Sequence, residues 1–187
     1  MSSNETYRLI GIDPGTNILG YAVIEVHYPT LRLVHMGVVN MLQLDDPGDK
    51  LQKIFRDLTE VLRFYHPKEM ALEAPFFGKN AQSMLKLGRA QGVAMAAALQ
   101  LDMPVTEYAP REIKKSVTGN GNASKEQVAG MLRQIVPFAT PDYLDATDAL
   151  AVAVTHYNKT ANPTLGGGRK KYSGWAKFMA DNPDRVG

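Results

Sequence analysis

The amino-acid sequence predicts an α/β fold in which a mixed five-stranded sheet is flanked by helices. Three strand-like segments follow one another near the N-terminus, with short turns between them. Two further strand-like segments come later, and each follows a segment with helical periodicity. Strands joined by a short turn pair antiparallel, whereas a strand after a crossover helix lies parallel to a strand already in the sheet. The predicted order of elements, βββαβαβααα, is typical of the layered α/β class.

The first half of the chain is expected to form three strands, a helix and a fourth strand, at residues 7–13, 18–26, 31–40, 47–66 and 69–73. Pro14 and Gly15 form a turn that ends the first strand, and Pro29 lies in the turn between the second and third. Between Leu51 and Tyr65, apolar residues recur at the spacing of one helix face, which predicts an amphipathic helix.

The second half is expected to form a long helix, a fifth strand and three closing helices, at residues 80–101, 105–108, from 110 onward, 124–136 and 141–157. Pro110 suits the first position of a helix, where its missing N–H costs nothing. Ser124 and Gln127 have the spacing of a capping box, which predicts a helix start. Pro141 is expected to open the last helix.

The length of 187 residues favours one folded domain, expected at residues 1–160, with a basic, glycine-rich tail at 161–187. The tail contains three consecutive glycines and is expected to be mobile, with Trp175 and Phe178 docking loosely on the body or on a partner. The chain has no cysteine, which excludes a disulfide scaffold, a cysteine zinc site and a thiol nucleophile. The N-terminus shows no secretory signal and no apolar run is long enough to span a bilayer, so we expect a cytoplasmic protein without membrane contact.

Charge is unevenly distributed along the chain, although the net charge is only +2. Residues 79–133 carry 8 basic and 4 acidic side chains, whereas residues 134–157 carry 3 acidic side chains and no basic ones. Charged runs are often solvated faces of no special function. Together, however, the segments fit a protein that contacts phosphates with one surface and holds a metal with another.

The last predicted helix contains two acidic residues in an otherwise apolar stretch. Asp145 and Asp148 are three positions apart, so they share one face of the helix. No lysine or arginine occurs within residues 134–157 to pair with them. Carboxylates are almost never buried without a partner. Either this face is exposed to water, or the two side chains belong to a functional site.

Two more acidic residues end predicted strands. Asp13 ends the first strand and Glu73 ends the fourth, so parallel pairing of these strands would place both carboxylates at one sheet edge. Each residue alone is equally compatible with a turn-capping role. Four acids converging without a basic partner would raise one another's pKa values and destabilise the fold. A divalent cation resolves this conflict, and hard oxygen ligands select Mg²⁺ or Mn²⁺.

Several motifs in this order resemble the RuvC family, the Holliday-junction resolvases of bacteria. The resemblance is carried by residues 11–16 (GIDPGT), 72–80 (LEAPFFGKN), 85–94 (LKLGRAQGVA), 107–115 (EYAPREIKK) and 144–156 (LDATDALAVAVTH). It covers residues 7–158. Each motif alone is weak, whereas the ordered set is highly specific. The resemblance implies an RNase H-like fold, which agrees with the predicted order of elements.

The resemblance also implies a reaction and a set of partners. It assigns the catalytic, metal-binding acids to Asp13, Glu73, Asp145 and Asp148, where the third position varies in the family between Asp and His. It implies two Mg²⁺ ions per active site, with Mn²⁺ as a substitute. The expected protein is a homodimer that resolves four-way junction DNA by symmetric paired nicks during recombination and repair, together with the branch-migration proteins RuvA and RuvB.

The same resemblance indicates where the junction DNA is bound. The expected DNA-binding residues are Phe76, Phe77, Lys79, Arg89, Arg111, Lys114, Lys115 and Lys125. Lys114 and Lys125 match basic positions that contact phosphate in the family. Phe76 matches an aromatic residue that inserts at the junction centre and stacks on a base. The alternative for each lysine is a solvated surface position, and for each phenylalanine a ring packed under its own loop.

Three other functions remain to be distinguished. The segment around Asp13 also resembles the first phosphate loop of actin-like ATPases and sugar kinases, but those proteins need two such domains and a second phosphate loop. The related YqgF-type nucleases share the first motif. A junction-binding protein without catalytic activity is disfavoured because all four acids are present. Paired symmetric nicking of a synthetic four-way junction would separate these possibilities.

Overall fold

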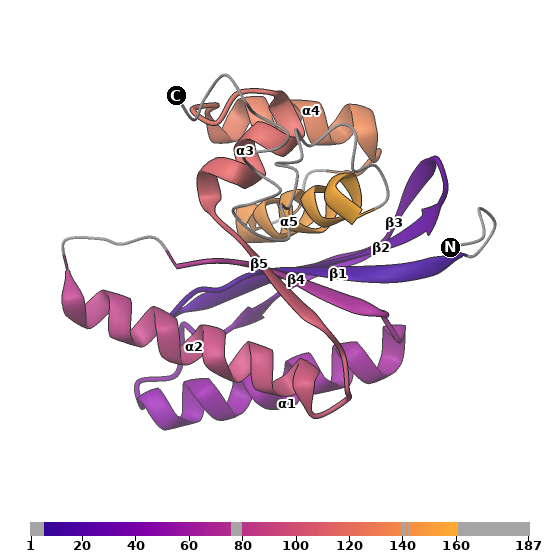
Figure 1. Cartoon of the computed structure of the whole chain (residues 1–187). Coiled ribbons are helices and arrows are strands. Elements are labelled where there is room, and N and C mark those ends of the chain that lie inside the picture. Colours follow the sequence, from indigo (N-terminus) through magenta and orange to yellow (C-terminus); the bar gives the residue numbers. More distant parts are fainter. Residues whose placement is uncertain (1–5, 76–79, 140, 142, 161–187) are drawn as a thin grey trace, which may run out of the picture.

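The computed structural model describes residues 6–75, 80–139, 141 and 143–160. Within this part of the chain, one sheet has the strand order β3-β2-β1-β4-β5. Helices α1 and α2 cover one face of the sheet, and α3, α4 and α5 cover the other (Figure 1). The strands are β1 Tyr7–Asp13, β2 Ile18–His27, β3 Thr30–Asn40, β4 Glu69–Glu73 and β5 Val105–Tyr108. The helices are α1 Pro47–Tyr65, α2 Ala81–Leu99, α3 Pro110–Thr118, α4 Lys125–Ile135 and α5 Leu144–Thr160.

The predicted order of elements and the mixed sheet are confirmed. Strand β1 pairs antiparallel with β2 and parallel with β4, and β4 pairs parallel with β5. The last helix differs from its prediction, because it begins at Leu144 instead of Pro141 and ends at Thr160. Its additional turn is stabilised by a hydrogen bond from the Thr160 hydroxyl to the His156 carbonyl and by an ion pair between Lys159 and Glu112 of α3.

Alternation along the central strands assigns side chains to the two faces. In β1, Leu9 packs into the core shared with α5, whereas Ile10 and Ile12 pack into the core shared with α1 and α2. Successive side chains of a strand point to opposite faces. Asp13 therefore follows Leu9 onto the α5 face, and Glu73 follows Ala71 of β4 onto the same face.

Helix α5 lies unusually close to the sheet because two strand positions are glycines. A Cβ atom on Gly20 of β2 would lie 2.0 Å from the carbonyl oxygen of Asp145. A Cβ atom on Gly11 of β1 would lie 2.2 Å from the carbonyl oxygen of Ala149. Only glycine permits this approach of a helix backbone to a strand. The contact is continuous with the buried surface of α5, which is inaccessible to water over most of its length.

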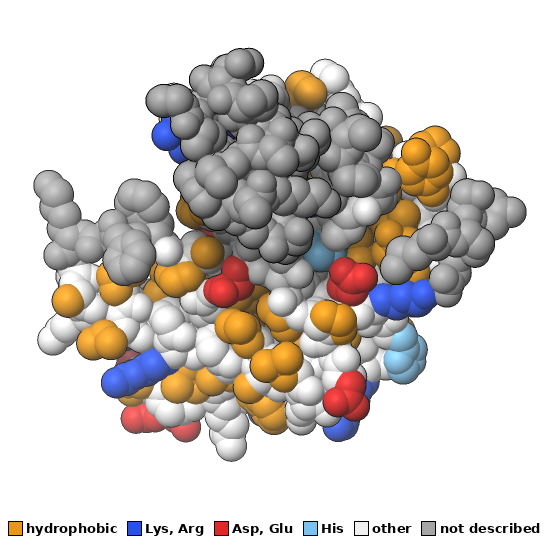
Figure 2. Space-filling view, viewed as in Figure 1, with side chains coloured by type: hydrophobic (Ala, Val, Ile, Leu, Met, Phe, Trp, Pro, Cys, Tyr) orange, Lys and Arg blue, Asp and Glu red, His pale blue; other side chains and the backbone are white. Residues whose placement is uncertain are grey.

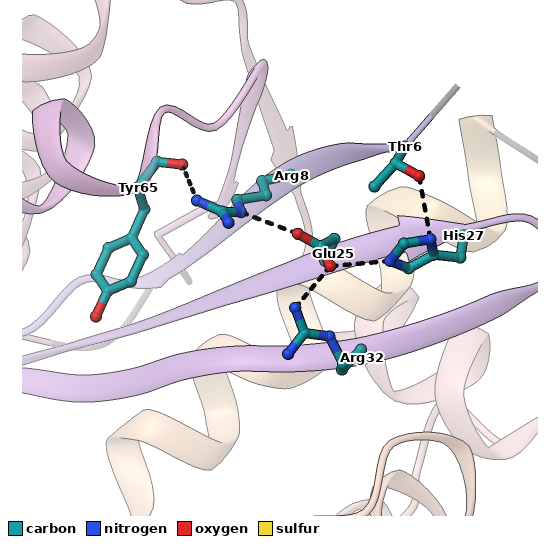
Figure 3. Close-up of polar contacts among 6 residues, drawn as sticks. All are labelled: Thr6, Arg8, Glu25, His27, Arg32 and Tyr65. Atoms are coloured by element: carbon teal, nitrogen blue, oxygen red, sulfur yellow. Dashed lines mark hydrogen bonds and ion pairs between the residues drawn. The ribbon is translucent and has the colours of Figure 1, made fainter. Parts of the chain in front are cut away.

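A buried carboxylate ties the three antiparallel strands to the end of α1 (Figure 3). Glu25 of β2 accepts hydrogen bonds from Arg8 of β1 at 3.2 Å and from Arg32 of β3 at 2.7 Å. Its carboxylate is also hydrogen-bonded to the Nε2 atom of His27, at 2.9 Å. Arg8 also donates to the Tyr65 carbonyl at 3.0 Å. Hydrogen bonds from Arg32, then from His27 and Arg8, lower the pKa of Glu25 to about 2, although burial opposes them.

The expected division into a folded domain and a tail stays a prediction. Residues 161–187, including Trp175 and Phe178, lie outside the described residues. Among the helices that the structure describes, none has an apolar stretch long enough to cross a lipid bilayer.

Replacing Glu25 with Gln is expected to lower the free energy of unfolding by about 1–2 kcal/mol at pH 7, because three partners lose their carboxylate. The folded pKa of about 2 lies below the ordinary 4.5, so the stabilisation is complete above pH 4.5 and is lost as the pH falls toward 2. Urea unfolding at pH 7, 4 and 3 measures the difference in unfolding free energy between wild type and Glu25→Gln, which should shrink as the pH falls. Glu60→Gln, on the exposed side of α1, is the control, and a Glu25→Gln deficit independent of pH would contradict the assignment.

Replacing Gly20 with Ala is expected to destabilise the fold by about 2–3 kcal/mol, because the new methyl group overlaps the backbone of α5. Gly130→Ala is the matched control, because its Cβ meets no atom within 4 Å. Since Gly130 lies inside α4, alanine should raise stability there by about 0.5–1 kcal/mol. Thermal or urea unfolding of both variants gives the comparison. Equal effects of the two substitutions would show that α5 does not rest on Gly20.

Candidate active site

Asp13 and Glu73 come together because two parallel strands end at the same edge of the sheet. Strands β1 and β4 pair in parallel, with Ile12 beside Leu72. The next residue of each strand is the acidic one, and both face α5. The prediction that these two carboxylates meet at one sheet edge is therefore supported by the strand register.

Asp145 and Asp148 are brought to the same edge by the first turns of α5. The backbone of Asp145 rests on Gly20, and Gly20 is the register partner of Asp13 in the β1–β2 ladder. The glycine contact thus places the start of α5 beside the end of β1. Asp148 lies one turn further along the same helix face.

A pocket of about 120 Å³ opens among these residues. Its polar lining consists of Asp13, Glu73, Asp148, Lys114 and Lys125. The remaining lining residues are Pro110, Ile113, Val128 and Ala151. Three of the four predicted acids and two of the predicted basic residues therefore share one pocket. Asp145 does not line it, although its charge acts on Asp13.

The electrostatics of this pocket are unfavourable for the free carboxylates. Burial, followed by the charges of Glu73, Asp148 and Asp145, raises the pKa of Asp13 to about 8, against the opposing effect of Lys125. Burial, followed by the charge of Asp148, raises the pKa of Glu73 to about 6. Such shifts are typical of functional sites, where like charges are held together by the surrounding fold. The cluster therefore needs a counter-charge when the acids are ionised.

Lys125 supplies part of that counter-charge. Its ammonium Nζ lies 2.6 Å from Oδ2 of Asp148, and the hydrogen bond to this carboxylate raises the pKa of Lys125. The lysine is the first residue of α4, where Ser124 and Gln127 form the predicted capping box. The expectation that Asp148 has no basic partner is therefore wrong. The partner comes from another helix, beyond the segment without basic residues.

The donor set fits a hard divalent cation. The acids offer desolvated carboxylate oxygens, which Mg²⁺ and Mn²⁺ prefer, and the raised pKa values indicate a need for positive charge. Within the described ranges, however, no three histidine or acidic side chains lie close enough together to form a ligand set. The side chains thus gather around one pocket without closing a coordination shell.

The remaining predicted DNA-binding residues are distributed over two regions. Arg111 and Lys115 are exposed on α3, at the side of the acid pocket. Arg89 is exposed on α2 and lines a different pocket. Phe76, Phe77 and Lys79 lie outside the described residues, so their roles stay predictions.

Sequence reasoning missed the residues that position the acids. Gly20 and Gly11 bind nothing, yet they determine where α5 lies. A glycine inside a strand is a signal that another backbone approaches closely, and this signal is present in the sequence at both positions. Ser124 was recognised as a helix cap, but its consequence for Lys125 depends on how α4 packs against α5.

Comparison with known proteins identifies the family. The family model described as crossover junction endodeoxyribonuclease RuvC matches residues 9–156. The protein of that name from Cytophaga hutchinsonii is 52% identical over 179 residues, covering 95% of this chain and 87% of the relative. The one from Bacteroides fragilis is 50% identical over 181 residues, covering 95% of each.

Solved structures agree with this match. The structure of T. thermophilus RuvC in complex with Holliday junction substrate has a TM-score of 0.75 at 34% identity and covers 80% of this chain and 92% of that one. The yeast mitochondrial Holliday junction resolvase Ydc2 has a TM-score of 0.60 at 13% identity over 81% of this chain and 78% of that one, which shows likeness of fold alone. The expected RNase H-like fold is confirmed by these neighbours. The chain belongs to the RuvC family of crossover junction endodeoxyribonucleases.

Proposed function

We propose that this protein hydrolyses phosphodiester bonds in four-way junction DNA, with Asp13, Glu73, Asp145 and Asp148 as its metal ligands. One observation carries the site assignment: mutually repelling, half-buried acids share a pocket with two lysines at the end of the central strands. Family membership supplies the substrate. The YqgF-type nuclease and the actin-like ATPase are not favoured, because the family match extends over most of the chain.

The chain's own residues have distinct tasks in this reaction. The four acids would hold two Mg²⁺ ions, or Mn²⁺ in their place, which when bound stabilise charge on the scissile phosphate and lower the pKa of the attacking water. Ile113 and Val128 form apolar pocket walls that limit access of bulk water. Lys114 lines the same pocket and offers a positive charge to the DNA backbone.

Lys125 is proposed to exchange one anionic partner for another. Its side chain is 68% exposed and the Asp148 side chain 22%, so this ion pair is accessible from solvent. An exposed ion pair contributes little stability, and a lysine stem rotates at small cost. The ammonium can therefore leave Asp148 and contact a DNA phosphate beside the acids.

We also propose that the protein acts as a homodimer through α2. Hydrophobic side chains are spread over the face that includes α2, with few charged ones among them (Figure 2). Leu85 and Leu99 are 63% and 56% exposed, and Cβ atoms on Gly88 and Gly92 would meet nothing within 4 Å. A two-fold dimer matches paired nicks in a two-fold substrate. Cooperation with RuvA and RuvB, and a cytoplasmic location, are proposed from family membership.

Removing one carboxylate should separate cutting from binding. Asp13→Asn, Glu73→Gln, Asp145→Asn and Asp148→Asn are each expected to reduce nicking in Mg²⁺ by at least about a hundredfold, because stabilisation of transition-state charge is lost. Junction binding in EDTA should persist or tighten, since one acid no longer repels phosphate. Gel assays of both steps with a synthetic four-way junction measure this.

Asp102→Asn is the matched control for these variants. Asp102 is exposed, lies in the turn before β5, and has the positive φ of 54° that asparagine tolerates. It should cut at the wild-type rate. The site assignment would be wrong if the four variants lost junction binding in EDTA, or if they cut as well as Asp102→Asn.

Stability without metal should depend on pH through Asp13. Its folded pKa of about 8 exceeds the ordinary 3.8, so the folded state loses stability as the pH rises from about 4 to 8. Asp13→Asn removes this penalty and should be more stable than wild type at pH 8 in EDTA, by at most about 5 kcal/mol, and no more stable at pH 4. Urea unfolding at both pH values tests this. Added Mg²⁺ should stabilise the wild type at pH 8, and a variant gain that is equal at pH 4 would contradict the prediction.

A further inference from the structure

A second pocket lies at the same edge of the sheet as the acids, on the opposite face. Its volume is about 260 Å³, and it lies between the first turns of α1 and α2 and the turn after β1. Its charged and polar lining consists of Thr16, Asn17, Asp45, Lys50, Ser83, Lys86 and Arg89. Its apolar lining consists of Pro47, Leu51, Ile54 and Ala90. We propose that this pocket binds a backbone phosphate of the junction DNA, with Lys50 as its central ligand.

The cations of this pocket lack acidic partners. Among the residues that the structure describes, no ion pair involves Lys50, Lys86 or Arg89. Elsewhere on the same helix, Lys53 and Arg56 both pair with Asp57, at 2.6 and 2.9 Å. Asp57 therefore neutralises Lys53 and Arg56, whereas no acid of α1 pairs with Lys50, which stays available to an anion.

Lys50 is held in place by a neutral group. Its Nζ donates a hydrogen bond to Oδ1 of Asn17 at 2.7 Å, and the side chain is half-buried beside Leu51. An amide oxygen orients the ammonium without cancelling its charge. The pocket carries three cations against one acid, Asp45, so its net charge favours a phosphate. The first amides of α1 do not contribute, because Asp46 already accepts from Gly48 and Asp49.

The position of the pocket favours DNA over a free anion. Asn17 follows Asp13 by four residues, and three residues of extended chain span at most about 11 Å between Asp13 and Thr16. Successive nucleotides of one strand rise about 3.4 Å along the duplex axis. A strand with its scissile phosphate at Asp13 that runs along this edge of the sheet toward Thr16 would therefore bring a phosphate to the Thr16 end of the pocket within about three nucleotides. This inference rests on the proposed function and adds a strand-positioning contact to it.

The test removes the charge of Lys50 and measures junction binding in EDTA at several salt concentrations. Lys50→Gln should weaken binding by about tenfold at 0.1 M salt and lower the slope of log Kd against log salt concentration by about 1. Lys50→Arg should keep the wild-type slope. Arg63→Gln is the matched control: it removes one exposed positive charge from the last turn of α1 and should leave both quantities unchanged.

Each outcome supports or overturns the inference. A Lys50→Gln variant that is folded by circular dichroism and has the wild-type salt slope would overturn it. A second result would also overturn it. If inorganic phosphate raised the thermal stability of wild type but not of Lys50→Gln, while both had the same salt slope for junction binding, the pocket would serve a free anion. If wild type itself neither bound nor nicked the junction, the proposed function would fail instead.

Discussion

The contact between the α5 backbone and two strand glycines is the constraint on which the site depends. Gly11 and Gly20 allow the helix to approach the sheet more closely than any other residue would permit. Because Gly20 pairs with Asp13, the same contact that packs the core also brings Asp145 beside the end of β1. The position of the acids therefore follows from main-chain packing, with no contribution from attraction between the acids, which repel one another.

That repulsion is built into an otherwise well-satisfied structure. Among the described residues, no buried side-chain polar atom lacks a hydrogen-bond partner. The distant carboxylate of Glu25 shows the usual solution, since two arginines and a histidine surround it and lower its pKa. Asp13 and Glu73 show the opposite shift in a pocket with two lysines. The contrast separates a carboxylate that stabilises the fold from the carboxylates that we propose as metal ligands.

Much of the fold and the core of the site could be predicted from the sequence. Turn residues and helical spacing located the elements, and parallel pairing after a crossover predicted that Asp13 and Glu73 meet. The partner of Asp148 could not be predicted, because the approach of Lys125 depends on the packing of α4 against α5. Lys50 was missed for a similar reason. In the sequence it is one of several bases on an amphipathic helix, and only the structure shows that Lys53 and Arg56 pair with Asp57 whereas Lys50 pairs with no acid.

The way α5 is seated has a consequence for how related sequences can diverge. The helix is held by Gly11 and Gly20, so the connection that precedes it does not determine where its acids lie. Insertions or deletions between α4 and α5 can be accommodated in that connection. A shift of the helix by a single residue would instead turn each acid by about 100° around the axis and bring the wrong side chain to the sheet edge. Length variation among relatives should therefore accumulate before Leu144 and stay out of the stretch from Asp145 to Ala153.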